Sequence, residues 1–122
     1  MDKLLIGDFE GPLDLLLHLI KQSKMDIYNI EIVKITEQYI NFINKMEQMN
    51  LDVASEYLVL AAELIELKSR YLLPKPEIDS SDEYEENPEE ELKRRLIEYE
   101  QYKNSSQVFR ELEKKRSSYY TK

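Results

Sequence analysis

The sequence predicts an all-α protein: a small N-terminal three-helix domain with one long third helix, then an acidic linker and a helical arm that depends on a partner. The main observation is the segment 52–74, whose apolar residues recur at alternating steps of four and three, the spacing that keeps side chains on one face of a helix. Two earlier segments show similar spacing. A run of acidic residues separates these three N-terminal segments from the last apolar-patterned segment, at the C-terminal end of the sequence. We therefore expect an N-terminal domain at residues 1–76, a linker at 77–88 and an arm at 89–122.

The first predicted helix spans residues 12 to about 23. Gly11-Pro12 predicts its start, because the fixed φ and missing N–H of proline suit the first helical position, and Asp14 favours the positive N-terminal end. Apolar residues lie nearly all round this helix, which predicts the buried centre of a small bundle. They are Leu13, Leu15, Leu16, Leu17, Leu19 and Ile20. Before this helix, we expect residues 4–10 to form either one brief strand or an extended lead-in segment.

The second predicted helix runs from Ile32 to about Gln48, after a connector at residues 25–31. Its apolar residues recur at steps of three and four, which predicts one buried face. They are Ile32, Ile35, Tyr39, Phe42, Met46 and Met49.

The long third helix carries two apolar stripes. The Tyr57 stripe consists of Val53, Tyr57, Leu60, Leu64, Leu67 and Tyr71, and the Ile65 stripe consists of Ala54, Leu58, Ala61, Ile65 and Leu72, with Lys68 as its charged member. Together they span about half of the circumference, more than the stripe of about 100° that a surface helix needs for its own core. One stripe is thus available for the helix of another protein, and periodicity alone does not decide which. We expect Asp52 to cap the helix, and Pro74 and Pro76 to end it.

The arm differs from the domain in charge. Residues 77–91 hold nine acidic residues and no basic one, as in a solvated linker, whereas residues 92–122 hold nine basic and four acidic ones. Asn87-Pro88 predicts a new helix with Asn87 as its N-cap. Its apolar stripe is thin and has a polar break at residues 104–106. We expect this helix to be marginal alone and to gain stability in the groove of a partner, with its aromatic residues as anchors.

No catalytic, cofactor or metal site is expected. With no cysteine, one histidine and two glycines, the chain lacks the residues of thiolate metal sites, of most nucleophilic enzymes and of phosphate-binding loops. We expect His18 at the surface or rim, and Glu63 and Glu66 on a solvated face rather than as a catalytic acid and base. No segment approaches the run of about 18 apolar residues of a membrane span, and no signal peptide is recognised, which predicts a soluble, intracellular chain.

Several blocks of the sequence resemble the bacterial segregation and condensation protein A (ScpA) family, the kleisin subunits of the SMC–ScpAB condensin. The blocks are FEGPLDLLLHLI at 9–20, MDI at 25–27, ITEQYI at 35–40, EYLVLAA at 56–62 and KSRYLLP at 68–74. They cover the N-terminal domain nearly end to end, and the arm from Glu90 resembles the middle region of the family.

The resemblance implies two protein partners. In this family the third helix packs against the coiled-coil neck above one SMC ATPase head, and the middle region crosses an ScpB dimer. As SMC-neck-binding residues we predict Tyr57, Leu60, Ala61, Leu64, Ile65 and Lys68. As ScpB-binding residues we predict Leu92, Leu96, Tyr99, Tyr102 and Phe109. For each of them, packing within the core of this chain is the alternative, and for Leu60 and Leu64 the two alternatives are about equal.

The resemblance also implies a strap without chemistry of its own, which serves chromosome condensation and segregation in the cytoplasm, at the nucleoid. It implies no cofactor, no membrane contact, no small-molecule substrate and contact with DNA only through the complex. The C-terminal winged-helix domain of the family, which caps the other SMC head, is not expected in this chain.

Two other hypotheses remain open at this point. A nucleic-acid-binding regulator would use Lys93, Arg94 and Arg95 and lose affinity steeply with salt, although the net charge of −8 argues against it. A generic helical adaptor is the other, and an enzyme is the poorest match because site residues are missing.

Overall fold

The computed structural model describes residues 5–73 and 87–120, with side chains up to Arg116. It contains one 3₁₀-helix, η1 (Ile6–Asp8), and four α-helices: α1 (Pro12–Gln22), α2 (Ile32–Gln48), α3 (Ser55–Leu72) and α4 (Pro88–Tyr120). The described residues form no strand, which confirms the all-α fold class. Most of the predicted linker lies outside the described residues.

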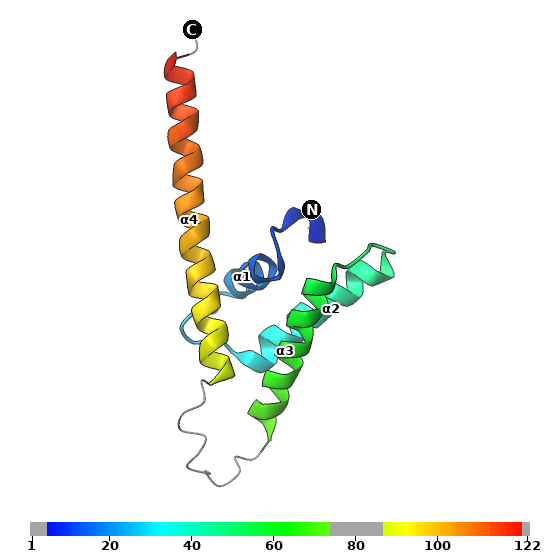
Figure 1. Cartoon of the computed structure of the whole chain (residues 1–122). Helices are drawn as coiled ribbons and strands as arrows, with labels where there is room; N and C mark the ends of the chain where they lie inside the picture. Colours follow the sequence, from blue (N-terminus) through cyan, green and yellow to red (C-terminus); the bar gives the residue numbers. More distant parts are fainter. Residues whose placement is uncertain (1–4, 74–86, 121–122) are drawn as a thin grey trace.

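The helices form a small bundle from which one helix protrudes. Helix α1 lies between α4 on one side and the pair of α2 and α3 on the other (Figure 1). The second half of α4 extends beyond the other helices (Figure 1). The chain therefore consists of a packed part, built from α1 to α3 and the start of α4, and a single projecting helix.

A single cluster of buried residues joins all four α-helices. Its centre is the leucine-rich face of α1, where Leu15 and Leu16 are fully buried, as the sequence predicts. The fully buried Tyr39 of α2 donates a hydrogen bond from its hydroxyl to the carbonyl oxygen of Tyr57, at 2.8 Å. Burial raises the pKa of Tyr39, so this phenol stays neutral and acts as a donor within the core. This hydrogen bond fixes the start of α3 against α2.

Left-handed residues end α1 and α2. Lys24 and Asn50 both have φ of 58°, the conformation that closes a helix through a Schellman motif. After α2, the N–H of Leu51 donates to the carbonyl oxygen of Met46 at 3.0 Å, and the N–H of Asn50 donates to that of Glu47 at 2.9 Å. The same two bonds recur after α1, and they satisfy carbonyl groups that would otherwise lack partners. Each motif turns the chain sharply toward the next helix.

Two local predictions about helix starts are wrong. The segment before α1 was expected to be a strand or extended, but residues 6–8 form η1, and the Asp8 carboxylate accepts a hydrogen bond from the Leu5 N–H at 2.7 Å. Asp52 does not cap α3, because the helix begins at Ser55 and its N-cap is Ala54, whose backbone is extended and whose side chain makes no capping bond. Val53, which packs against the core cluster, accounts for the extended approach.

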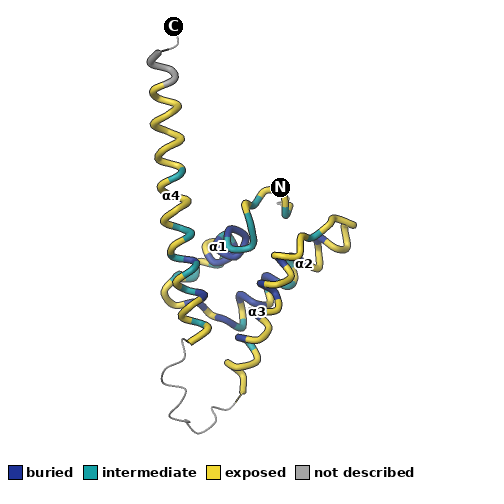
Figure 2. The backbone as a smooth tube through the Cα atoms, in the orientation of Figure 1, coloured by how far each residue is buried: buried dark blue, intermediate teal, exposed yellow. Residues whose placement is uncertain are grey.

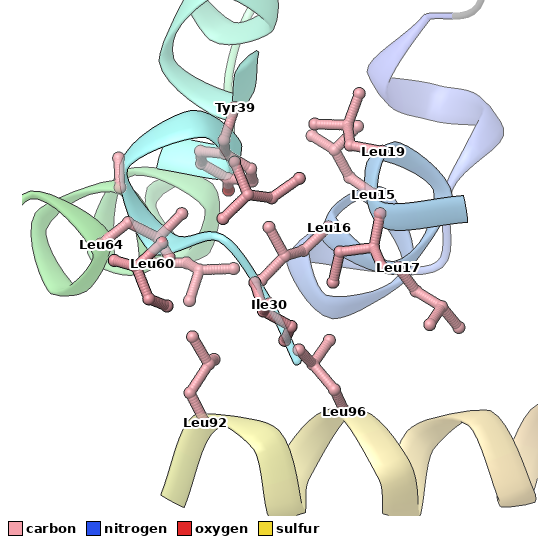
Figure 3. Packing of buried hydrophobic residues seen from close by; sticks show 14 of the residues in the cluster. Leu15, Leu16, Leu17, Leu19, Ile30, Tyr39, Leu60, Leu64, Leu92 and Leu96 are labelled. Atoms are coloured by element: carbon pink, nitrogen blue, oxygen red, sulfur yellow. The ribbon is translucent and has the colours of Figure 1, made fainter. Parts of the chain in front are cut away.

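Helix α4 corrects a further expectation. It was expected to depend on a partner for its packing, but its first half packs on the core of the same chain, because Leu92 is 1% exposed and Leu96 is fully buried in the cluster. Figure 3 shows both side chains pointing from α4 toward the buried residues of α1 and α3. The helix continues through the polar residues 104–106, which interrupt its apolar stripe as expected. The predicted N-cap is present, since the Asn87 side chain accepts a hydrogen bond from the Glu89 N–H at 3.1 Å.

Candidate partner-binding surfaces

The Tyr57 stripe of α3 faces the core of the chain itself. Tyr57, Leu60, Leu64 and Leu67 are all buried, and so is Ala61 of the neighbouring stripe. Four of the six residues predicted to bind an SMC neck, Tyr57, Leu60, Ala61 and Leu64, are thus occupied by intramolecular packing. In this conformation these four side chains hold α3 against the core of the chain and are not exposed to a partner.

The Ile65 stripe faces outward. Ile65 is 50% exposed and Leu72 63% exposed, and Leu58 is exposed as well. These side chains form a band along the side of α3 that is not packed on the core. Figure 2 shows buried and exposed stretches alternating along the tube of α3. The structure therefore distinguishes the two stripes, which the sequence could not do. Val59 and Tyr71, the last residue of the Tyr57 stripe, are also exposed on α3, at 59% and 64%.

The exposed stripe is one wall of a groove between α2 and α3, with a volume of about 570 Å³. Its lining residues are Thr36, Glu37, Ile40, Asn41, Ile65, Lys68, Ser69 and Leu72. At its base, the Thr36 hydroxyl donates to the Leu64 carbonyl oxygen at 3.4 Å and links the two helices. Beside it, Lys68 forms an exposed ion pair with Glu37 at 3.5 Å. Its lining combines three apolar side chains, Ile40, Ile65 and Leu72, with five polar or charged ones, a mixture that suits an amphipathic helix.

The α2 wall of this groove was missed by the sequence analysis. Ile40 is only half-buried and lies one residue from Tyr39, outside the stripe of apolar residues that α2 turns toward the core. The sequence did contain a signal for this wall, because Ile40 is an apolar residue beside the core stripe of α2. The second apolar stripe on α3 was recognised from the same kind of pattern.

Helix α4 is joined to the bundle by polar contacts as well as by Leu92 and Leu96. Its first half forms three ion pairs: Arg95 with Glu63 at 2.6 Å, Lys103 with Asp14 at 2.6 Å, and Glu100 with Lys21 at 3.2 Å. Farther along the helix, the exposed Arg110 pairs with Glu10 at 3.8 Å. The Tyr99 hydroxyl donates to the Glu10 carboxylate at 2.9 Å, and burial raises the pKa of Tyr99. In three of the four ion pairs a basic residue of α4 meets an acidic residue of the domain.

Asp14 is the most enclosed of these acidic groups, with a side chain only 5% exposed. It accepts hydrogen bonds from the Glu10 N–H at 3.0 Å and from the Lys103 ammonium at 2.6 Å. It also lies in the first turn of α1, where a negative charge is favourable. One carboxylate therefore joins the segment before α1, α1 itself and α4.

Asp14→Ala is expected to lower the free energy of unfolding by about 1–3 kcal/mol, because both donors lose a shared buried acceptor. Glu90→Ala serves as the control, since it removes an exposed pair with Lys93 and should cost about 0.5 kcal/mol or less. Urea unfolding followed by circular dichroism measures both. Equal stability of the two variants would show that the Asp14 contacts do not anchor α4.

The five residues predicted to bind ScpB fall into two groups. Leu92 and Leu96 are buried, and Tyr99 is partly buried against the core. Tyr102 and Phe109 are more than half exposed. Val108 and Leu112, which were not among the predicted site residues, are equally exposed on the projecting half of α4. They lie farther along α4 than Leu92 and Leu96, and at about 100° per residue Leu112 is about 160° around the helix from both of them.

The titratable side chains singled out in the sequence, His18, Glu63 and Glu66, all contact other side chains in the structure. Across residues 5–73 and 87–120, no three His, Asp or Glu side chains gather in a way that could hold a metal ion. His18 is partly buried, and its ring packs against Phe9 with ring centres 5.4 Å apart. In the same ranges, no helix is long and apolar enough to cross a membrane. Glu63 is engaged with Arg95 and Glu66 with Arg70, so each has a structural role.

A helical bundle with a groove between two helices and a projecting helix that exposes apolar side chains is typical of a protein-binding module. The sequence profile of the family described as Segregation and condensation protein ScpA matches residues 19–122. The chain belongs to this family. It is also 50% identical over 117 residues to proteins named Segregation and condensation protein A from Bacillus cereus strain AH187 and Bacillus anthracis strain CDC 684 / NRRL 3495. Those matches cover 93% of this chain and 47% of each relative, so the chain spans about half the length of its relatives.

Proposed function

We propose that this chain is a non-enzymatic kleisin subunit that links the coiled-coil neck of an SMC ATPase to ScpB in a bacterial condensin. In this role it serves chromosome condensation and segregation in the cytoplasm, at the nucleoid, and contacts DNA only through the complex. Membership of the ScpA family supports the general role. The observation that carries the proposal is the apolar groove between α2 and α3, which no described segment of this chain fills.

The neck is proposed to dock along the Ile65 stripe. The helices of a coiled coil carry both apolar and charged positions. In the groove, Ile65 and Leu72 would contact the apolar positions, and Lys68 and Glu37 would contact the charged positions. Tyr57, Leu60 and Leu64 contribute indirectly, because they hold α3 on the bundle in the orientation that exposes Ile65. Ala61 contributes in the same way, since it is buried in the core cluster and does not line the groove.

ScpB is proposed to bind α4. Among the residues predicted for this contact, Tyr102 and Phe109 are accessible in the structure, whereas Leu92, Leu96 and Tyr99 face the bundle. The nucleic-acid alternative is less well supported, because Lys93 is paired with Glu90 and Arg95 with Glu63. Neither residue is then available to neutralise a phosphate without breaking an existing ion pair.

Isothermal titration tests the proposal. The chain is titrated separately with ScpB and with an SMC head that retains its coiled-coil neck, both from the same organism. We expect binding in the micromolar range or tighter to both, with a weak dependence on salt. Absence of binding to both partners would refute the proposed function, and DNA binding that falls steeply with salt would support the regulator instead.

A further inference from the structure

One face of helix α4 changes from apolar to polar along its length. Leu92 and Leu96 lie on this face near the base and are buried in the core cluster. Tyr99, Lys103 and Arg110 continue it, because at about 100° per residue all five side chains point within about 60° of one another. The last three meet carboxylates of the bundle. Helix α4 is thus attached in two ways, by apolar packing at its base and by polar contacts farther along.

Two carboxylates near the start of α1 receive these three side chains. The Tyr99 hydroxyl donates to one oxygen of Glu10 at 2.9 Å, and Arg110 pairs with the other oxygen of Glu10 at 3.8 Å. Lys103, which lies between them, donates to Asp14 at 2.6 Å. Tyr99 and Arg110 are about 16 Å apart along the helix axis, from the rise of about 1.5 Å per residue. Glu10 therefore connects two points of α4 that are about three turns apart.

The segment that carries Glu10 is itself packed on the bundle. We call residues 5–11, which precede α1, the clasp. Within it, the ring of Phe9 packs against His18 of α1 and Phe42 of α2, with ring centres 5.4 and 5.9 Å apart. The Glu10 N–H donates to the Asp14 carboxylate at 3.0 Å. The clasp thus joins three helices, α1 and α2 through Phe9 and α4 through Glu10.

The polar contacts of α4 are more accessible to water than the apolar ones. The side chains of Glu10 and Arg110 are 52% and 74% exposed, whereas Leu92 and Leu96 are buried. Exposed ion pairs are individually weak and are screened by salt, while buried leucines resist exposure. From residue 107 to 116 every side chain of α4 is exposed (Figure 2). The direction of this half therefore depends on the polar contacts, and the attachment of the base depends on the leucines.

We infer that the clasp controls the direction of α4. When Glu10 engages Tyr99 and Arg110, the helix is held along the bundle; when Glu10 is released, the helix turns about Leu92 and Leu96, which stay buried. A cationic group of another molecule that captured Glu10 would therefore release the far half of α4. Because coupling between two sites is reciprocal, holding α4 also orders the clasp. The inference concerns contacts within one chain and does not depend on the partners that the proposed function assigns.

Distances between spin labels test the inference. The chain has no cysteine, so Ala62→Cys on α3 and Leu112→Cys on the far half of α4, both exposed, give a labelled pair without other changes. Glu10→Ala is expected to shift or broaden the distance between these labels. A change in direction of about 10° moves residue 112, which is about 24 Å beyond Leu96, by about 4 Å. An unchanged distance distribution would overturn the inference.

Two controls locate the effect. A second pair of labels, Ala62→Cys with Arg94→Cys, reports on the base of α4 and should keep its distance in Glu10→Ala. A change there would show that the whole helix leaves the bundle, which would contradict the buried anchor. Glu37→Ala removes an exposed ion pair with Lys68, at 3.5 Å between α2 and α3, and should change neither distance. If it acted like Glu10→Ala, the effect would be a general loosening of the bundle and the clasp would be refuted.

The same contacts are removed from the α4 side by Tyr99→Phe combined with Arg110→Ala, which leaves the clasp itself unchanged. We expect the label at Leu112 to move as it does in Glu10→Ala. The amide of Glu10, whose N–H is bonded to Asp14, should also exchange with solvent about fivefold faster or more, since the clasp is less ordered. Nuclear magnetic resonance measures this rate. An unchanged rate would refute the coupling between α4 and the clasp.

Discussion

Leu96→Ala is expected to lower the free energy of unfolding by about 2–5 kcal/mol, the range for a fully buried leucine that leaves a cavity. Leu96 is 0% exposed although it lies in α4, beyond the acidic linker in the sequence. Because small domains are stable by only about 5–15 kcal/mol, such a loss is a large fraction of the total. Chemical denaturation followed by far-UV circular dichroism measures it.

The control for this experiment lies on the same helix. Leu112→Ala makes the same chemical change at an exposed position and is expected to cost about 0.5 kcal/mol or less. If the two variants were equally stable, α4 would not be part of the folded domain. The arm would then be separate from the bundle, as the sequence alone suggested.

Ile65→Glu is expected to weaken binding to the SMC neck by about 100-fold or more while leaving the stability of the isolated chain nearly unchanged. The reason for the first effect is that an unpaired carboxylate would be buried in an apolar contact. The reason for the second is that Ile65 is 50% exposed and contributes little to the core. Titration against an SMC head with its neck, together with a thermal melt, measures both effects.

Val59→Glu is the matched control for Ile65→Glu. Val59 lies on the same helix and is 59% exposed, but it points about 120° away, toward the side of α3 that faces Tyr99. We expect Val59→Glu to retain neck binding. If it lost binding as completely as Ile65→Glu, the neck would contact a different side of α3 from the groove, and the assignment of the Ile65 stripe would be wrong.

Much of the fold could be predicted because it depends on local patterns. The spacing of apolar residues and the turn residues predicted α1 and α2 to within a residue, and Asn87-Pro88 predicted the start of α4. The failure at Asp52 has a physical cause, since the packing of Val53 determines where α3 begins and outweighs a favourable capping residue. Local propensity is a weak prior when a tertiary contact opposes it.

The surfaces were less predictable because they depend on contacts between distant segments. Which stripe of α3 faces inward is decided by the position of α2, and no residue of α3 encodes that by itself. Likewise, Arg95 meets Glu63, and Lys103 meets Asp14, across 32 and 89 residues of sequence. Leu92 and Leu96 were predicted to contact a partner, but the surface that covers them in the structure lies within the same chain.

The length of α4 has a mechanical consequence. A helix of 33 residues is about 50 Å long, and only its first half rests on the bundle (Figure 1). It therefore acts as a lever whose pivot is Leu92, Leu96 and the neighbouring ion pairs. A tilt of about 10° at Leu96 displaces the far end, which is about 36 Å away, by about 6 Å, from the same rise per residue. Side-chain repacking at the base of α4 would thus be amplified into a displacement of several ångströms at its tip.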